Sequence, residues 1–161
     1  MTNAEKKLLL IDLCSRLPYG VKGLHRGKVH ELFTIDGRVV SNACIQVDGY
    51  DAWFPIDTFK PYLRPMSSMT KEEIEEYRNL SDEVIGSYGP YHHEFSVHCV
   101  RLGIKPDNPH ECVDDFLNMD AIDWLNAHYF DYRLVPSTGK TMIESNLALE
   151  APEGMYKIEL V

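Results

Sequence analysis

The spacing of apolar residues predicts a helix at the start of the chain. Apolar side chains recur every three or four residues at Leu9, Leu10, Leu13, Cys14 and Leu17. This spacing places them on one side of a helix over residues 4–17. Pro18 and Gly20 follow directly, and both residues commonly mark the end of a helix.

From Val21 onward the apolar residues alternate with polar ones, which is typical of strands. Four runs rich in Val, Ile, Phe and Trp are predicted to be strands: Val21–Arg26, Lys28–Ile35, Val39–Val47 and Ala52–Ile56. The gaps between them hold Arg26-Gly27, Asp36-Gly37 and Asp48-Gly49, which favour tight turns. The pattern predicts an antiparallel meander that forms a small SH3-like barrel or a curled sheet. Residues 53–63 resemble the end of such a barrel, where a short helical turn follows the penultimate strand.

Beyond Pro65 the chain becomes acidic and mainly helical. Thr70 and Glu73 have capping-box spacing, which predicts a helix over residues 71–78. Asp120 is expected to cap a later helix, and added strands are expected at residues 91–102 and 155–161. We therefore predict a helical part with one or two extra strands over residues 65–161.

Two further expectations concern packing in this second part. Trp124 and His128 are four residues apart, so their side chains are expected to stack on one helix face. Arg64, which stands between Leu63 and Pro65, is expected to hold the acidic helices electrostatically.

Together these elements predict an α+β protein in a single compact domain over residues 1–161. Its parts are an N-terminal helix over 1–20, a barrel-like sheet over 21–64 and the helical part over 65–161. A chain of 161 residues with 44% hydrophobic side chains has enough apolar material to bury a core without metals or disulfides.

The sequence favours a cytoplasmic protein with reduced cysteines. No apolar run approaches the roughly 18 residues of a membrane-spanning helix, and no signal peptide is recognisable at the N-terminus. The four cysteines show no C-x-x-C spacing, so we expect reduced and mostly buried thiols.

Charge is distributed unevenly along the chain. Residues 1–64 hold nine Lys and Arg against seven Asp and Glu, whereas residues 65–161 hold seven against eighteen. The net charge of −9 argues against bulk nucleic-acid binding, which requires clustered cations. A local basic site remains compatible with the first part.

The densest basic cluster surrounds the turn at Arg26-Gly27. It contains Lys22, His25, Arg26, Lys28 and His30, and alternation places Lys28 and His30 on one strand face. Such cations can bind a phosphate or carboxylate while an exposed aromatic ring stacks on the ligand. The predicted ligand-binding residues are Lys22, His25, Arg26, Lys28, Trp53 and Tyr62. The alternative is a charged hairpin end that only discourages edge pairing.

A second cluster holds potential metal ligands, namely His92, His93, His98, Cys99, His110 and Cys112. On a strand, His92 and His98 would lie roughly 20 Å apart, so they cannot share one ion. We therefore assign no metal or other cofactor, and a metal-dependent enzyme using residues 92–112 stays an open alternative.

No catalytic residue is assigned from the sequence. Residues 137–141 end in Gly-Lys-Thr like a phosphate-binding loop, but Leu134 stands where that motif requires glycine. The acidic residues at 114, 115, 120 and 123 are explained by helix capping and a solvated surface.

Three stretches together resemble small bacterial and phage-borne proteins with no established activity. They are KPYLRPMSSMT at residues 60–70, DWLNAHYFDYR at 123–133 and ALEAPEGMY at 148–156, with LPYGVK at 17–22 added. The resemblance covers the beginning, middle and end of the chain, whereas residues 82–118 are particular to it. It implies an accessory protein of a bacterial mobile element or prophage, and it supplies no catalytic or cofactor residue.

These observations favour a non-enzymatic accessory binding protein that recognises a protein partner or a small anionic ligand. The enzyme that uses residues 92–112 is one alternative, and a structural subunit that forms homo-oligomers is another.

Overall fold

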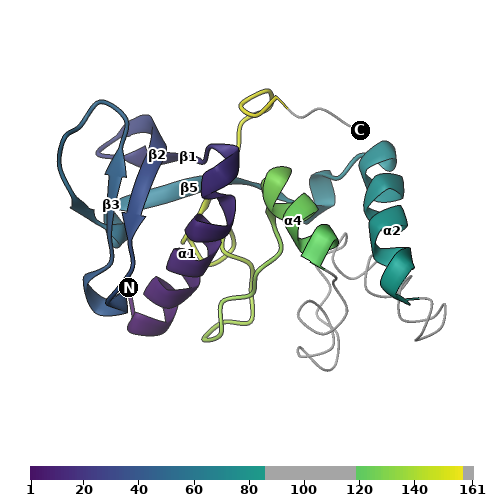
Figure 1. The fold of residues 1–161 in the computed structure, drawn as a ribbon, viewed down its shortest axis with the longest axis horizontal. Helices are drawn as coiled ribbons and strands as arrows, with labels where there is room; N and C mark the ends of the chain where they lie inside the picture. The colour runs from purple at the N-terminus through teal and green to yellow at the C-terminus, as the bar shows by residue number, and fades with distance from the viewer. Residues whose placement is uncertain (86–118, 158–161) are drawn as a thin grey trace. The chain divides into compact units, whose positions relative to one another are not determined.

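The computed structural model describes residues 1–85 and 119–157, and it confirms an α+β fold (Figure 1). Its contacts form two compact units. The first unit contains Met1–Leu63 and Arg133–Pro152, and the second contains Arg64–Tyr132 and Glu153–Val161. The strand predicted at 91–102 lies outside the described residues, as do the histidine and cysteine residues of the 92–112 cluster. The single domain stays a prediction.

Helix α1, Asn3–Arg16, confirms the predicted N-terminal helix to within one residue. Thr2 and Glu5 cap its first turn reciprocally, and Gly20 with a φ of +79° ends the short η1 turn, Leu17–Tyr19, that follows. Leu9, Leu10 and Leu13 are buried as expected.

The predicted burial of cysteine is wrong for the thiol on α1. Cys14 is exposed and Cys44 is half-buried, and both are free thiols. The apolar spacing predicts that Cys14 lies on the buried face of the helix. Asp12 and Arg16 are fully buried instead, because their ion pair offsets the cost of burying two charged side chains.

The predicted antiparallel meander is confirmed in the first unit. Its strands are β1 (Lys22–His25), β2 (Lys28–Asp36), β3 (Cys44–Val47), β4 (Phe54–Pro55) and β5 (Phe59–Pro65), with η3 (Ile56–Thr58) between the last two. They lie in the order β4-β3-β2-β1-β5. The first and last strands of this order, β4 and β5, are not paired with each other in the described residues, so the sheet is open and a closed SH3-like barrel is not shown.

Two of the predicted turns form as expected and one does not. Arg26 and Gly27 have φ values of +50° and +77°, which form a two-residue turn between β1 and β2. Gly49 also has a positive φ, of +78°. The predicted tight turn at Asp36-Gly37 does not form, because Gly37 has no positive φ and residues 37–43 connect β2 to β3. This connection contains the η2 turn, Val40–Asn42, so β3 begins at Cys44 and not at Val39 as predicted.

A β-bulge at Phe33 determines which face of β2 is buried. Leu32 pairs with Val47 and Thr34 pairs with Gln46, so Phe33 is an extra residue in β2. The bulge keeps Leu32 buried and Ile35 packed against the same core although these residues are three positions apart. Phe33 itself is 72% exposed.

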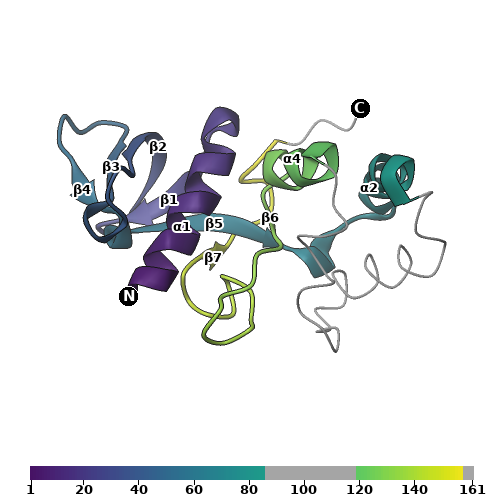
Figure 2. The same ribbon diagram turned by 60° about the horizontal axis from the view of Figure 1, so that its bottom comes forward.

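Residues Arg133–Pro152 complete the first unit although they are far away in sequence. Strand β7, Leu149–Glu150, pairs in parallel with β5, where Tyr62 lies opposite Leu149 (Figure 2). Buried side chains of this segment, including Val135, Met142 and Leu147, join the core formed by α1 and the meander.

The second unit packs two helices and one short strand around a separate core. They are α2 (Lys71–Ile85), α4 (Met119–Ala127) and β6 (Phe130–Asp131). Figures 1 and 2 show α2 beside α4, and their core contains Met66, Tyr77, Ala121, Trp124, Leu125 and Phe130. Helix α4 begins one residue before Asp120, which was predicted to cap it. The expected closing strand does not form over the described residues 155–157.

The predicted role of Arg64 as an electrostatic anchor is confirmed within this unit. Its guanidinium donates two hydrogen bonds to the Glu73 carboxylate, at 2.8 and 2.9 Å. The backbone N–H of Thr70 donates to Glu73 and the Thr70 hydroxyl accepts from the Glu73 N–H, so the predicted capping box is also present.

These bonds determine the charge state of Glu73. Burial alone would raise the pKa of Glu73, but the hydrogen bonds from Arg64 and from the Thr70 backbone more than offset burial, so this pKa lies below its usual range. The carboxylate is therefore ionised at neutral pH and holds the end of β5 to the beginning of α2.

We predict that Gly23→Ala destabilises the first unit. A Cβ atom at Gly23 would lie 2.3 Å from the Phe59 ring and 2.7 Å from the Lys60 carbonyl oxygen. Such overpacking reduces the free energy of unfolding by about 1–3 kcal/mol, which urea denaturation measures. Gly27→Asn is the control, because nothing surrounds that position and Asn tolerates a positive φ. Equal stability of both variants would contradict the close approach of Phe59.

We also predict that Glu73 contributes stability that is lost in acid. Because its folded pKa is depressed, the contribution is present above the unfolded value of about 4.3 and disappears as pH falls through the folded pKa. The difference in melting temperature between wild type and Glu73→Gln should therefore shrink steadily below about pH 4. A difference that is the same at every pH would show that the ionised carboxylate is not what stabilises this unit.

Candidate functional site

The β1–β2 hairpin contains four of the six predicted ligand-binding residues, but the strand register places them on different faces. Lys22 lies opposite Glu31, and His25 lies opposite Lys28. Residues directly opposite each other in an antiparallel pair share a face, and successive residues alternate. Lys22 is therefore on one face of the hairpin, and His25 and Lys28 are on the other. The predicted common face of Lys28 and His30 agrees with this register.

The face that carries Lys22 is the outer face, away from the core of the first unit. Leu24 lies opposite Val29 on β2 and opposite Lys60 on β5, so Tyr62, two residues beyond Lys60, shares this face. Lys22, Leu24, Lys60 and Tyr62 are half-buried, whereas Val29 and Phe33 are 52% and 72% exposed. We call Lys22, Leu24, Val29, Phe33, Lys60 and Tyr62 the outer patch.

The inner face holds His25, which was predicted to bind a ligand but is fully buried. Its Nδ1 lies 3.2 Å from the Thr58 carbonyl oxygen. A carbonyl only accepts, so Nδ1 carries the proton and Nε2 is the unprotonated nitrogen of the neutral ring. Among the described residues, nothing forms a hydrogen bond with this buried Nε2.

His30, which lies opposite Gly23, has the same arrangement. Its Nδ1 lies 3.0 Å from Asp48 Oδ1, and this carboxylate oxygen also accepts the Glu31 N–H at 2.9 Å. His30 Nε2 is likewise buried without a hydrogen-bond partner in the described part of the chain. Asp48 therefore fixes the orientation of His30 from the turn that follows β3.

Aromatic rings surround both imidazoles. The His25 and His30 ring centroids are 5.9 Å apart, and Tyr50 packs edge-on against both, at 6.2 and 5.4 Å. The Phe54 ring lies 4.5 Å from His25, and the Arg26 guanidinium lies 4.6 Å above Phe54. We call His25, His30, Tyr50 and Phe54 the histidine–aromatic cluster.

The structure thus brings together only part of the predicted site. Arg26 joins the histidine–aromatic cluster, whereas Lys22 and Tyr62 belong to the outer patch. Trp53 is half exposed beside Phe54, and Lys28 is exposed opposite His25. The ligand-binding assignment of these residues stays a prediction.

Sequence reasoning missed the exposed residues Val29 and Phe33 and the ring of Tyr50. For Val29 the signal was available, because alternation that places Lys28 and His30 on one face places Val29 on the other. For Phe33 and Tyr50 the position depends on a bulge and on a turn contact, neither of which has a sequence pattern here.

Trp124 and His128 in the second unit stack as predicted. Their ring centroids are 4.0 Å apart, and His128 Nδ1–H donates to the Trp124 carbonyl at 2.8 Å. Both side chains are buried in the second unit. The indole N–H of Trp124 forms no hydrogen bond among the described residues.

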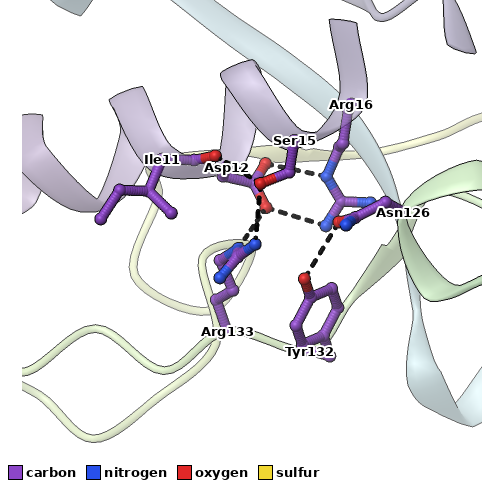
Figure 3. A network of polar contacts seen from close by, with 7 residues as sticks. All are labelled: Ile11, Asp12, Ser15, Arg16, Asn126, Tyr132 and Arg133. Carbon is purple, nitrogen blue, oxygen red and sulfur yellow. Dashed lines mark hydrogen bonds and ion pairs between the residues drawn. The ribbon is translucent and has the colours of Figure 1, made fainter. Parts of the chain in front are cut away.

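A buried ionic network lies in the first unit (Figure 3). Arg16 donates two hydrogen bonds to the Asp12 carboxylate, both at 2.9 Å, and Arg133 donates to the same carboxylate at 3.2 Å. Arg133 also donates to the Ser15 hydroxyl, which donates to the Ile11 carbonyl. These bonds give Asp12 a structural role, because its buried carboxylate joins α1 to Arg133.

Within residues 1–85 and 119–157, no three His, Cys, Asp or Glu side chains are grouped so that they could hold a metal ion. Cys14 is exposed overall, but partial burial of its sulfur raises the pKa of the thiol, which favours the protonated form. No helix in this part of the chain has the length and apolar character needed to cross a membrane.

Comparison with known protein families, with curated proteins and with solved structures finds no match to this chain. The resemblance to bacterial and phage-borne proteins therefore stays a prediction. The chemistry of the outer patch and of the histidine–aromatic cluster is what remains to indicate a function.

We predict that Asp12→Asn strongly destabilises the protein. The substitution leaves two arginines at a buried site without their counter-charge, and breaking a buried pair in this way costs about 3–5 kcal/mol. Urea denaturation gives the free energy of unfolding. Asp36→Asn is the matched control, since the Asp36–Arg38 pair is exposed and its loss should have a much smaller effect. Similar losses in both variants would contradict the role assigned to burial.

Proposed function

We propose that this chain is a non-enzymatic binding protein whose outer patch recognises an acidic segment of a protein partner that also carries apolar side chains. The observation that carries the proposal is the exposure of Phe33 and Val29 on the sheet face opposite the core. A sheet with one packed face normally presents polar side chains on the other face. Neighbouring exposed apolar side chains at such a place are typical of interaction surfaces.

The strand register places the members of the outer patch on one face, where the exposed Glu31 stands between Val29 and Phe33 and opposite Lys22. Leu24 lies directly opposite Val29, and Lys60 lies opposite Leu24 on the other side of β1. Phe33 projects from the bulge on the same strand as Val29. An aromatic side chain of this kind can act as an anchor that contributes most of the binding free energy.

The charges of the outer patch support a partner with acidic residues. Lys22 and Lys60 stand among its apolar side chains, and Glu31 is the carboxylate nearest to them in the register. Cations at the edge of an apolar surface favour a partner with complementary carboxylates and increase its rate of association. The partner segment is therefore expected to alternate acidic and apolar residues.

An SH3-like arrangement of the first unit belongs to the same proposal. The order β4-β3-β2-β1-β5, with the η3 turn directly before β5, supports it. The role as an accessory protein of a mobile element or prophage rests on the sequence resemblance. A small anionic ligand is the second candidate, because Arg26 and the exposed Lys28 stand together at the hairpin end.

We predict that Phe33→Ser strongly weakens the binding of peptides selected by the protein. A random peptide library displayed on phage and selected on the immobilised chain should yield acidic sequences with aromatic or aliphatic anchors. Loss of an anchoring aromatic should weaken their binding at least about 30-fold, because such residues contribute 2 kcal/mol or more. Isothermal titration calorimetry with the selected peptides measures this change.

Val39→Ser is the matched control, because Val39 is 57% exposed but lies outside the outer patch. Its affinity should equal that of wild type, and Lys60→Glu should weaken binding in a salt-dependent manner. Peptides that bind both serine variants equally would overturn the proposal. If tripolyphosphate displaces the peptide from the wild-type chain but not from Arg26→Ser, the small anionic ligand is favoured instead. Sedimentation of the free chain shows whether it is a homo-oligomer instead.

A further inference from the structure

The histidine–aromatic cluster contains two neighbouring imidazoles, with ring centroids 5.9 Å apart, that are held in the same way. In both rings the Nδ1–H is fixed by an oxygen acceptor, the Thr58 carbonyl for His25 and the Asp48 carboxylate for His30. In both rings Nε2 is buried with no hydrogen-bond partner among the described residues, and in the neutral form of each ring this nitrogen carries the lone pair. Leaving a buried polar atom unsatisfied is costly, and each such atom needs an explanation.

We propose that the Nε2 atoms of His25 and His30 bind one divalent transition-metal ion of the class that prefers imidazole nitrogen, such as Zn²⁺ or Cu²⁺. A histidine that binds a metal almost always donates its other ring N–H to a backbone carbonyl or a carboxylate. His25 and His30 each satisfy this rule, one with each kind of acceptor. The tautomer needed for binding is therefore already set.

The separation of the rings is compatible with one shared ion. Two imidazoles that bind a metal through Nε2 at ~2.0–2.1 Å place their ring centroids about 5–6 Å apart. The observed separation is 5.9 Å, with the ring planes inclined by 72°. The strand register produces this spacing, because His25 on β1 lies diagonally across from His30 on β2 and both face inward.

The surroundings decide the kind of ion and its affinity. Within the described ranges, the site has two nitrogen ligands and no third His, Cys, Asp or Glu to complete it. Two neutral nitrogen ligands disfavour Mg²⁺ and Ca²⁺, which prefer oxygen, and favour Cu²⁺ over Zn²⁺ by the usual order of stability. Tyr50 contacts both imidazoles and is 40% exposed, so its side of the cluster is the one open to solvent.

The test is metal binding by the full chain after treatment with a chelator and exchange into metal-free buffer. Zn²⁺ or Cu²⁺ alone is added, the bound ion is counted by native mass spectrometry, and the affinity is measured by competition with a chromophoric chelator. We expect one ion to bind at the cluster, with Cu²⁺ bound more tightly than Zn²⁺. His25→Phe and His30→Phe should each weaken binding at least about 100-fold, and Asp48→Asn should weaken it about tenfold or more.

His128→Phe is the matched control. His128 is also buried, donates its Nδ1–H to a carbonyl and has an Nε2 without a described hydrogen-bond partner, but no second imidazole accompanies it among the ring contacts of its unit. Its replacement should leave metal affinity unchanged. A quadruple Ala variant at residues 92, 93, 98 and 110 should retain the ion of the cluster, which separates this site from the other histidines of the chain.

Nitrogen-15 spectra of the histidine rings provide a test that needs no variant at the cluster and so does not depend on whether those variants fold. On addition of one equivalent of Zn²⁺, the Nε2 resonances of His25 and His30 should move and that of His128 should not. The proposal is overturned if neither resonance moves, if the chain binds no ion, or if binding is lost only in the quadruple variant.

Discussion

A buried carboxylate cannot remain ionised unless cations or hydrogen-bond donors surround it, and each unit of this protein contains a carboxylate held in this way. In the first unit, Asp12 on α1 is held by Arg16 and by Arg133. In the second unit, Glu73 at the beginning of α2 is held by Arg64 and by the Thr70 N–H. Asp12 joins α1 to Arg133, which is distant in the chain, and Glu73 joins the end of β5 to the beginning of α2.

The hairpin between β1 and β2 places the candidate functional residues on two opposite faces of the sheet. Its two-residue turn fixes the register, and the register places Lys22 and Val29 outward and His25 and His30 inward. A shift of one residue would exchange the two faces. The outer patch and the histidine–aromatic cluster therefore depend on the same turn although they offer different chemistry.

The two faces differ in the groups that they contain. The outer patch has the exposed side chains of Val29 and Phe33 beside the half-buried Lys22 and Lys60. The cluster has two buried Nε2 atoms without hydrogen-bond partners among the described residues, next to the rings of Tyr50 and Phe54. A metal bound at the cluster would also stabilise the hairpin that carries the outer patch, since binding to the native state alone favours folding.

The sequence alone determined the features that depend on neighbouring residues. Helix α1, the turn at Arg26-Gly27, the capping box of Thr70 and Glu73 and the stacking of Trp124 on His128 all arise from contacts within a few positions, where residue type and spacing are sufficient. The burial of Asp12, the return of Arg133–Pro152 to the first unit and the bulge at Phe33 were decided only by the tertiary structure. Their physical reason is shared: each depends on a partner far away in the chain, and local propensity carries no information about which distant residue that partner is.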